Sequence, residues 1–406
     1  MVNSLAGRAF FICAALFVYD VSLLDVAEAQ AGASTGVSAV ASPAAAAAIP
    51  FASCAPVIAK SCQVNEADGK PLSEAREIFG CLRKHETELP LECKTEIERF
   101  IQAGRQAAAR GGGALGSFGG LNPLSPPIPI FNFEGRISPE AEHRSDNRVS
   151  LSSPVYGSES GLLSASLSAA ETHFGDEITL TSGIRVRDLY RAEVGLQYSR
   201  RLENKRTFGL RGSIGSTGDQ LFQSSNDMSF SVNASYGFPG SGKDYWVLLA
   251  FIANNSPIGN YIPLPGLIYI HRTDTFTGII GFPIISLQWT PTTQWSYSVS
   301  VFGPILTAEV SNGEVDKTQL FAQAGFSQQT FILHDRARDR DRLTLQEKKV
   351  SVGIRKPLFL SSYGEFQIGR AFDRSMYVGE KLLKTDGGLA DLPNALYLTA
   401  SLKHVF

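Results

Sequence analysis

From about Asn147 onward, apolar and polar residues alternate with a period of two, which is the pattern of β-strands. Six stretches show it most clearly: residues 178–187, 193–199, 208–214, 229–236, 319–327 and 349–355. Their polar positions are mostly Ser, Thr, Gln and Gly with scattered Arg and Lys, whereas the outer face of a soluble β-sandwich carries many charges. We therefore predict strands with lipid on the apolar face and a wet, partly filled lumen on the polar face.

The last twelve residues, 395–406, alternate in the same way and end on Phe406. A strand with a terminal Phe resembles the closing strand of bacterial outer-membrane β-barrels, and the resemblance implies that the barrel assembly machinery recognises Phe406 as an assembly signal. His404 departs from the pattern, which usually has an apolar or aromatic residue at that position. The alternative is an ordinary edge strand of a soluble sheet.

Candidate strands between Gly161 and Phe406 number about twelve, with ten or fourteen still open, an even number as bacterial barrels have. The predicted fold is thus an all-β, antiparallel transmembrane β-barrel of about 12 strands, preceded by a small disulfide-linked α-helical module. With both barrel ends in the periplasm, the long connections Arg374–Asn394 and His334–Arg342 lie outside. The short ones, Pro357–Tyr363 and Asn312–Thr318, lie inside.

Two segments do not fit this count. Pro257–Asp274 is long but would be periplasmic, so either Leu267–Ile270 contributes a further strand or the segment enters the lumen. In Tyr297–Val310 the apolar residues occupy odd positions before Gly303 and Pro304 and even positions after them. We interpret this change as a bend within one strand.

The N-terminus has the features of a signal peptide over residues 1–29. Arg8 precedes the apolar run Ala9–Tyr19, and Ala27-Glu28-Ala29 supplies a small-x-small cleavage site. The apolar run is shorter than the ~20 residues that a transmembrane helix needs. Because we find no other stretch of that length, a membrane-spanning mature protein must be a barrel.

Residues 30–51 form an Ala-rich linker, and residues 52–104 show helical periodicity and contain four cysteines, Cys54, Cys62, Cys81 and Cys93. An even number of cysteines in an exported chain favours disulfides over a zinc site, for which the spacings lack a C-x-x-C element. On one helix, Cys54 and Cys62 would be ~12 Å apart and unable to bond each other. The pairings 54–81 with 62–93 and 54–93 with 62–81 both remain open.

The segments CAPVIAKSC and GCLRKHETELPLEC resemble the cysteine-rich repeat of a Golgi glycoprotein and of assorted bacterial exported proteins. The resemblance covers roughly fifty residues and implies a disulfide-stapled module without a defined chemistry, which is small enough to need such staples. We expect this module in the periplasm, where it could have a protein partner.

Residues 105–145 form a Gly/Pro-rich linker, and the barrel is expected over residues 146–406. Within the barrel, NYIPLPGLIYIHRTDTFTGIIGFPIISLQWTP resembles a family of uncharacterised bacterial outer-membrane barrels. That resemblance supports the fold and implies no activity.

Three motifs contain residue types that could carry chemistry. GFPGSGKD at residues 237–244 nearly matches a phosphate-binding loop, but Asp244 replaces the metal-binding hydroxyl and a strand follows instead of a helix, so we predict a hairpin turn. The run HDRARDRDR, residues 334–342, could contact lipopolysaccharide or calcium, but we favour a solvated extracellular loop. His173, His271 and His334 could serve a lipid hydrolase, although none has a recognisable spacing to a serine.

The polar faces of the predicted strands carry more basic than acidic residues. The basic set is Arg185, Arg187, Arg211, Lys349, Arg355 and Lys403, and the acidic set is Glu193, Glu309 and Glu365. These basic residues could select anions in a narrow pore. We favour their simpler role as ion pairs that fill a small barrel.

A net charge of −2 argues against a nucleic-acid partner. We predict an outer-membrane β-barrel in contact with lipid and lipopolysaccharide, with its cysteine-rich module in the periplasm, and neither an enzyme nor a cofactor protein. It would act as an envelope anchor or a narrow, anion-preferring channel. The alternatives are an outer-membrane lipid hydrolase and a soluble periplasmic β-sandwich binding protein.

Overall fold

The computed structural model of the 406-residue chain divides into two units, residues 1–105 and 106–406, which are described separately. Described in the first unit are residues 54, 57–58, 60, 82, 85 and 89–94. Described in the second are residues 129–405 apart from 141, 158–160, 243, 257–259, 274, 315–316, 359–361 and 381–386. The predicted signal peptide, the Ala-rich linker, Cys62, Cys81 and Phe406 lie outside the described residues.

In the first unit a disulfide joins Cys54 to Cys93, and both cysteines are fully buried. This bond belongs to the second of the two predicted pairings. Pro90 opens a helical turn at residues 91–94, where the Lys94 N–H donates to the Pro90 carbonyl at 3.0 Å. Within the described part of the chain, no helix is both long and apolar enough to cross a membrane.

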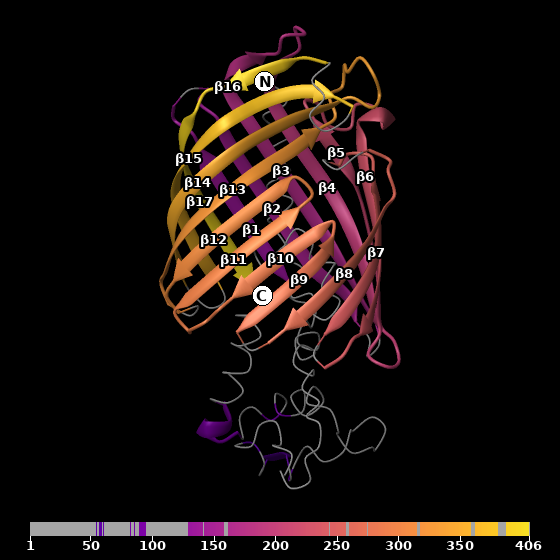
Figure 1. Cartoon of the computed structure of the whole chain (residues 1–406), viewed down its shortest axis with the longest axis vertical. Coiled ribbons are helices and arrows are strands. Elements are labelled where there is room, and N and C mark those ends of the chain that lie inside the picture. The colour runs from indigo at the N-terminus through magenta and orange to yellow at the C-terminus, as the bar shows by residue number, and fades with distance from the viewer. Residues whose placement is uncertain are drawn as a thin grey trace. The chain divides into compact units, whose positions relative to one another are not determined.

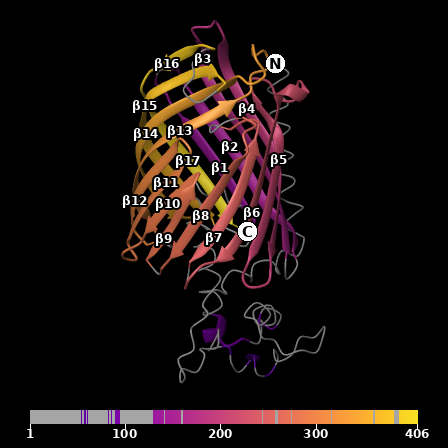
Figure 2. The same ribbon diagram turned by 45° about the vertical axis from the view of Figure 1, so that its right-hand side comes forward.

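The second unit is a closed antiparallel β-barrel (Figures 1 and 2). Strand β1 pairs with β2 on one side and with β17 on the other, neighbours pair in sequence from β2 to β15, and β15 pairs with β17. Sixteen strands therefore form the ring, while the short strand β16 pairs with β15 at the rim. The strands are β1 Ile130–Ile137, β2 Ser145–Gly157, β3 Gly161–Thr179, β4 Arg185–Arg201, β5 Thr207–Gly218, β6 Met228–Pro239, β7 Tyr245–Ala253, β8 Leu264–Arg272, β9 Phe276–Phe282, β10 Ile284–Trp289, β11 Trp295–Phe302, β12 Ile305–Asn312, β13 Gln319–Phe331, β14 Arg342–Pro357, β15 Ser362–Gly379, β16 Leu389–Leu392 and β17 Ala395–Val405.

The predicted count of about twelve strands is wrong. β1 lies inside the segment predicted as a linker, and β8 is the strand suspected within Pro257–Asp274. The segment Tyr297–Val310 forms two strands, β11 and β12, because the chain reverses at Gly303-Pro304 instead of bending. The first predicted strand, residues 178–187, is the hairpin between β3 and β4, and the other five alternating stretches are strands. In the first unit, the described residues contain helical turns but no complete helix of the predicted module.

The alternating positions separate the two faces of the wall as predicted. Val194 and Leu196 on β4 are more than half exposed on the outside, and Tyr397 and Thr399 on β17 are buried on the inside. Aromatic side chains gather on the outside near one end of the barrel, where the ring centroids of Trp246 and Tyr269 are 4.8 Å apart. Others at that end are Tyr198, Tyr236, Trp289, Trp295 and Tyr297. An apolar belt bounded by an aromatic girdle is typical of a barrel in a lipid bilayer.

The two ends of the barrel differ in their connections. The turn end holds Ile130, Val405 and short turns such as residues 313–318 and 358–361. The loop end holds the longer connections, including residues 332–341 and 380–394, in agreement with the prediction. At the turn end, GFPGSGKD is the predicted hairpin turn, in which the Gly240 N–H donates to the Asp244 carbonyl at 2.9 Å.

The wall of the barrel is uneven in height. Strands β3, β14 and β15 have 19, 16 and 18 residues, whereas β9 and β10 have 7 and 6. Figure 1 shows the β9–β10 and β11–β12 hairpins ending well below the loop end of β14 and β15. We call β9 to β12 the low wall and the long strands β2 to β5 and β13 to β15 the tall wall.

Candidate functional site: the closed loop end and the lumen

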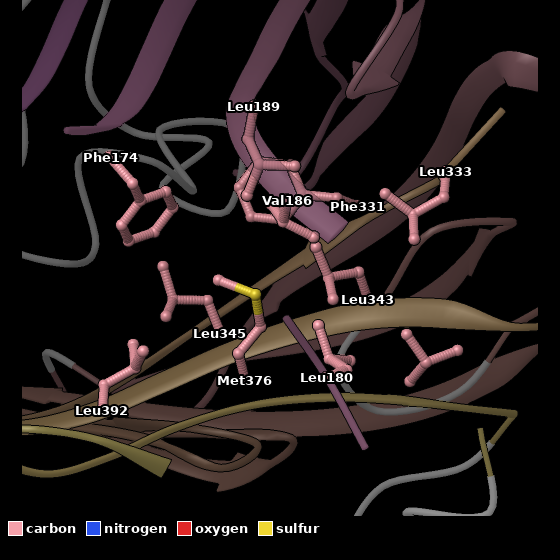
Figure 3. Close-up of a cluster of buried hydrophobic side chains, with 11 residues drawn as sticks. Phe174, Leu180, Val186, Leu189, Phe331, Leu333, Leu343, Leu345, Met376 and Leu392 are labelled. Carbon is pink, nitrogen blue, oxygen red and sulfur yellow. The ribbon is translucent and has the colours of Figure 1, made fainter. Parts of the chain in front are cut away.

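The tall wall closes on itself above the low wall around a cluster that we call the apolar plug. Its members come from opposite sides of the ring, β3 and β4 on one side and β13 to β16 on the other (Figure 3). The buried members are Phe174, Leu180, Val186, Leu189, Phe331, Leu333, Leu343, Leu345, Met376, Val378 and Leu392. Because closely packed apolar side chains leave little room for water, the plug closes the lumen at this level.

A layer of buried charges lies directly on the lumen side of the plug. Glu347, two residues from Leu345 on β14, is at its centre. Its carboxylate accepts hydrogen bonds from Arg136 and, at 3.2 Å, from Arg144, and the Arg374 guanidinium is 3.6 Å away. We call the set Arg136, Glu142, Arg144, Asp146, Glu347 and Arg374 the charged layer.

The remaining carboxylates of the charged layer neutralise its arginines. Asp146 accepts two hydrogen bonds from Arg144, at 2.9 and 3.0 Å, and Glu142 pairs with Arg374. The Arg144 guanidinium also faces the ring of Phe174 in the plug, 5.7 Å from its centroid. Since an unpaired buried charge is costly, this pairing is a condition for closing the barrel here.

A seam between β13 and β5 completes the closure. The Ile332 N–H donates to the Thr217 carbonyl at 2.8 Å, although nine strands of the ring span the interval from β5 to β13. Gly218 permits this approach, because a Cβ atom there would be 1.9 Å from the Ile332 carbonyl oxygen. Arg191 and Asn255 donate to the Thr330 carbonyl at 3.3 and 3.1 Å.

The charge run 334–342 fixes this seam through a group that we call the latch: Asp227, His334 and Arg336. The His334 Nδ1 is 2.8 Å and the Arg336 Nη1 is 3.4 Å from the Asp227 carboxylate. Burial opposes ionisation of Asp227, but hydrogen bonds from His334 and Ser224 outweigh it and lower the pKa of the carboxyl group. The hydrogen bond to Asp227 raises the pKa of His334.

The prediction of a solvated loop holds for residues 337–340, which are exposed, but not for Arg336, Asp341 and Arg342. The side chain of Arg336 is 5% exposed and that of Asp341 is 3% exposed, while Arg340 is exposed. Arg342 donates to the Asn254 carbonyl at 2.6 and 3.1 Å. The charged side chains of this run therefore pair with residues on the opposite side of the loop end as well as with each other.

Below the charged layer, the lumen has a polar side and an apolar side. On the polar side Arg355 donates to Glu365 at 2.7 Å and to Glu309 at 3.3 Å, and its guanidinium is 4.8 Å from the centroid of Phe321. On the apolar side the inward residues of β7 to β11 form what we call the apolar strip. It consists of Tyr245, Val247, Leu249, Ile268, Ile270, Ile279, Ile284 and Phe302.

The six basic residues selected from the sequence occupy different places. Arg185 and Arg187 are exposed near the loop end, and Arg185 is 3.5 Å from Glu177. Arg211 lies on the inner face of β5, in register with Gln197 and Asn233. The other three, Lys349, Arg355 and Lys403, are partly buried on the inner face of β14 and β17.

The histidines considered for hydrolysis are bonded to carboxylates. His173 contacts Asp188 at 2.5 Å on the outer face, and His271 contacts Asp244 at 2.7 Å at the turn end. Tyr269 also donates to Asp244, and together these hydrogen bonds lower the pKa of that carboxyl group. The serine–histidine pair that the described residues offer is Ser362 with His404, at 2.8 Å, but Ser362 is 2% exposed and thus poorly placed to attack a substrate.

Sequence reasoning missed Glu347, Asp227 and Gly218. Glu347 keeps the alternation of β14 and lies where the pairing with β15 shifts register, between Gln346 and Lys348, so no local signal marks it in the sequence. Asp227 and Gly218 carry no signal either, because their partners are more than a hundred residues away in the chain.

No protein-family model and no curated protein matches the chain. Solved outer-membrane barrels are similar at low levels. The Pseudomonas putida toluene transporter TodX is 9% identical, with 72% of this chain and 93% of that chain covered and a TM-score of 0.32. An outer-membrane channel from Pseudomonas putida F1 is 10% identical (69% and 94% covered, TM-score 0.30), and OmpT of Vibrio cholerae is 7% identical (69% and 96% covered, TM-score 0.28). Neither a substrate nor an activity follows from similarities this low.

The features of the barrel itself indicate its location. A closed ring leaves no unpaired strand edge, and its outside is apolar and bounded by aromatic residues at the turn end. These are the requirements for crossing a bilayer with strands. The chain has the fold of an outer-membrane β-barrel, which indicates the cell outer membrane.

Proposed function

We propose that this protein is a non-enzymatic, narrow channel of the outer membrane that is closed at its outer end by the plug and the latch. The loop end faces the outside, because bacterial barrels have short periplasmic turns and longer extracellular loops. The cysteine-containing first unit is then in the periplasm. Lipopolysaccharide, the barrel assembly machinery and a periplasmic protein are its expected partners.

The observation that carries this proposal is the way the loop end is closed. Packed side chains alone would be enough to close a barrel permanently. Here residues 332–341 cross to the opposite side of the loop end, where hydrogen bonds and ion pairs between a few residues hold them. Ion pairs and hydrogen bonds of this kind can break and reform without unfolding the wall. The latch therefore supports a gate, and the polar lumen below it supports a path for water.

The charges of the lumen favour anions. On the inner face below the charged layer, the described strands carry more basic than acidic residues. The basic residues are Arg148, Arg201, Arg211, Arg272, Lys349, Arg355 and Lys403. The acidic residues are Glu134, Glu193, Glu309 and Glu365. Excess positive charge along a narrow pore attracts anions and repels cations.

Single-channel recording in planar bilayers tests the proposal. We expect brief, small openings with anion preference, and Arg211→Glu should weaken or reverse that preference, since Arg211 lies on the inner face. Arg185→Glu is the matched control, because Arg185 is exposed near the loop end and should have a smaller effect. Cation preference of the unaltered protein would contradict the assignment of the lumen charges.

Envelope anchoring is the second candidate, and it is favoured by the plug. If folded protein, verified by its different gel mobility before and after boiling, leaves the bilayer sealed even after Asp227→Asn breaks the latch, the channel proposal fails and the barrel anchors the first unit. Hydrolysis of membrane lipids remains the enzymatic alternative, and release of fatty acid from phospholipid vesicles would support it.

A further inference from the structure

The low wall is too short to cross the apolar part of a bilayer. At ~3.3 Å per residue and a tilt of ~40°, a strand of 6 to 8 residues such as β9 to β12 rises only about 15–20 Å. The apolar band of an outer-membrane barrel is ~25 Å tall. The tips of the two hairpins, Phe282–Ile284 and Phe302–Ile305, therefore end within the band if their aromatic ends, at Trp289 and Trp295, lie at the turn-end interface.

The outer face of the low wall agrees with this estimate. Phe282 and Ile285 at the first tip are 57% and 41% exposed, and nothing polar follows them toward the loop end on these strands. On the tall wall, by contrast, the outward Phe326 is in register with the exposed Lys348, which forms an ion pair with the exposed Asp373. The tall wall thus passes through the interface, whereas the low wall has no polar end.

The chemistry of the tips suits an apolar surrounding. Each tip contains a proline, Pro283 or Pro304, and proline has no N–H group to leave unpaired. The Gly303 N–H of the second tip donates to the Pro283 carbonyl of the first at 3.3 Å. Because lipid cannot satisfy backbone polar groups, a turn within the band must limit or pair them, and these two turns do both.

The inner face of the tips is apolar as well. Ile284 faces inward and is buried, while the next residue, Ile285, faces outward, and Phe302 and Val301 repeat this arrangement on β11. Ile284 and Phe302 are the loop-end members of the apolar strip. An apolar surface therefore continues from the lumen, over the tips, to the lipid-facing side.

The seam of the tall wall crosses over this region. The hydrogen bond between Ile332 and Thr217 joins the ends of β13 and β5, and Arg342 donates to the Asn254 carbonyl just after β7. The plug therefore lies on the tall-wall side, and the short strands β8 to β12 remain outside the closure. The direct exit through the loop end is blocked by the plug. The wall that separates the lower lumen from the lipid is lowest at the tips of the low wall.

We propose that the lower lumen communicates laterally with the outer leaflet over the tips of the β9–β10 and β11–β12 hairpins, and that single-chain amphiphiles such as fatty acids cross the wall there. The acyl chain lies on the apolar strip, and the acidic head group is drawn to the basic side of the lumen. This route shares the lower lumen with the proposed channel, but it needs no opening of the latch and does not depend on ion conduction.

Photo-crosslinking at three phenylalanines tests the route in proteoliposomes of phosphatidylcholine. Each phenylalanine is replaced in turn by p-benzoylphenylalanine, which resembles it in shape, and the probe is an alkyne-bearing palmitic acid. Phe302 reports the inner face of the tip, Phe326 is the lipid-facing positive control, and Phe321 is an inward control on the tall wall away from the strip. Gel mobility before and after boiling verifies folding of each variant.

The expected result is labelling at position 302 that approaches that at 326 and is several-fold above that at 321. Labelling at 302 no stronger than at 321, with 326 labelled normally, would overturn the lateral route. The outcome is independent of the conductance measurement: labelling without anion conductance would reject the channel and keep the lateral passage, and conductance without labelling would do the reverse.

Discussion

Strands β14 and β15 on one side of the barrel are more than twice as long as β9 and β10 on the other, and the two sides use the bilayer differently. The tall wall has residues to spare above the apolar band, and it uses them to build the plug, the charged layer and the seam. The low wall has none, so its tips remain among lipid. The tall wall closes the barrel because its strands are longer than the bilayer requires. The low wall, whose strands are shorter, only lines the lumen.

The largest expected effect on this comparison comes from removing the charge at the centre of the tall wall. Glu347→Gln leaves Arg136, Arg144 and Arg374 without their shared partner, and uncompensated buried charge typically costs about 3–5 kcal/mol. We expect this loss in the free energy of unfolding measured by urea denaturation in detergent.

The matched control for this change is Asp373→Asn, which breaks the exposed ion pair between Lys348 and Asp373 on the same two strands. Exposed pairs contribute about 0–1 kcal/mol, so this variant should stay close to the unaltered protein. Equal losses in both variants would show that the charged layer has no special role.

A smaller effect is expected at the seam. Gly218→Ala places a methyl group where the Ile332 carbonyl lies. Overpacking of this kind lowers the free energy of unfolding by about 1–3 kcal/mol. We expect residues 332–341 to become more sensitive to protease while the barrel stays folded. Gly212→Ala on the same strand is the control, since its Cβ would meet no atom within 4 Å. Unchanged proteolysis of the Gly218 variant would argue against the seam.

The smallest expected effect is the dependence of the latch on pH. The pKa of His334 is raised, so its interaction with Asp227 is complete below the ordinary value of about 6.5 and is lost as pH rises through the raised value. Asp227, with its lowered pKa, stays ionised throughout this range. Channel openings should therefore become more frequent toward alkaline pH, and His334→Gln should flatten the dependence. Openings that increase toward acid pH would contradict the latch.

The difference between the two walls also explains what the sequence could predict. On the tall wall and its neighbours, strands such as β4 and β14 have one apolar and one polar face, so alternation identified them and their orientation. On the low wall the alternation stops at the hairpin tips, where the neighbours Ile284 and Ile285 are both apolar although they face opposite sides. Because the chain reverses at Gly303-Pro304 in a very short turn, β11 and β12 resemble one bent strand in the sequence, and β1 lies in a segment that resembles a linker. The predicted count is too low for these reasons.

The closed loop end was beyond sequence reasoning for another reason. The run 334–342 has the composition of a solvated loop, and only its partners show otherwise: Asp227, Asn254 and Thr217 lie far away in the chain. The same holds for Glu347 with Arg136 and Arg144. Long-range pairing is a property of the fold, and a single sequence carries little trace of it.

The pairing of β1 with β17 has a consequence for how the chain is made and exported. The first strand of the ring, from Ile130, finds its second neighbour only in the last strand, in register with Val405. Until β17 has been synthesised and delivered, both edges of the growing sheet stay unpaired. A prematurely terminated chain cannot close its ring, and its open edges would expose it to degradation, so that closure itself distinguishes complete chains from defective ones.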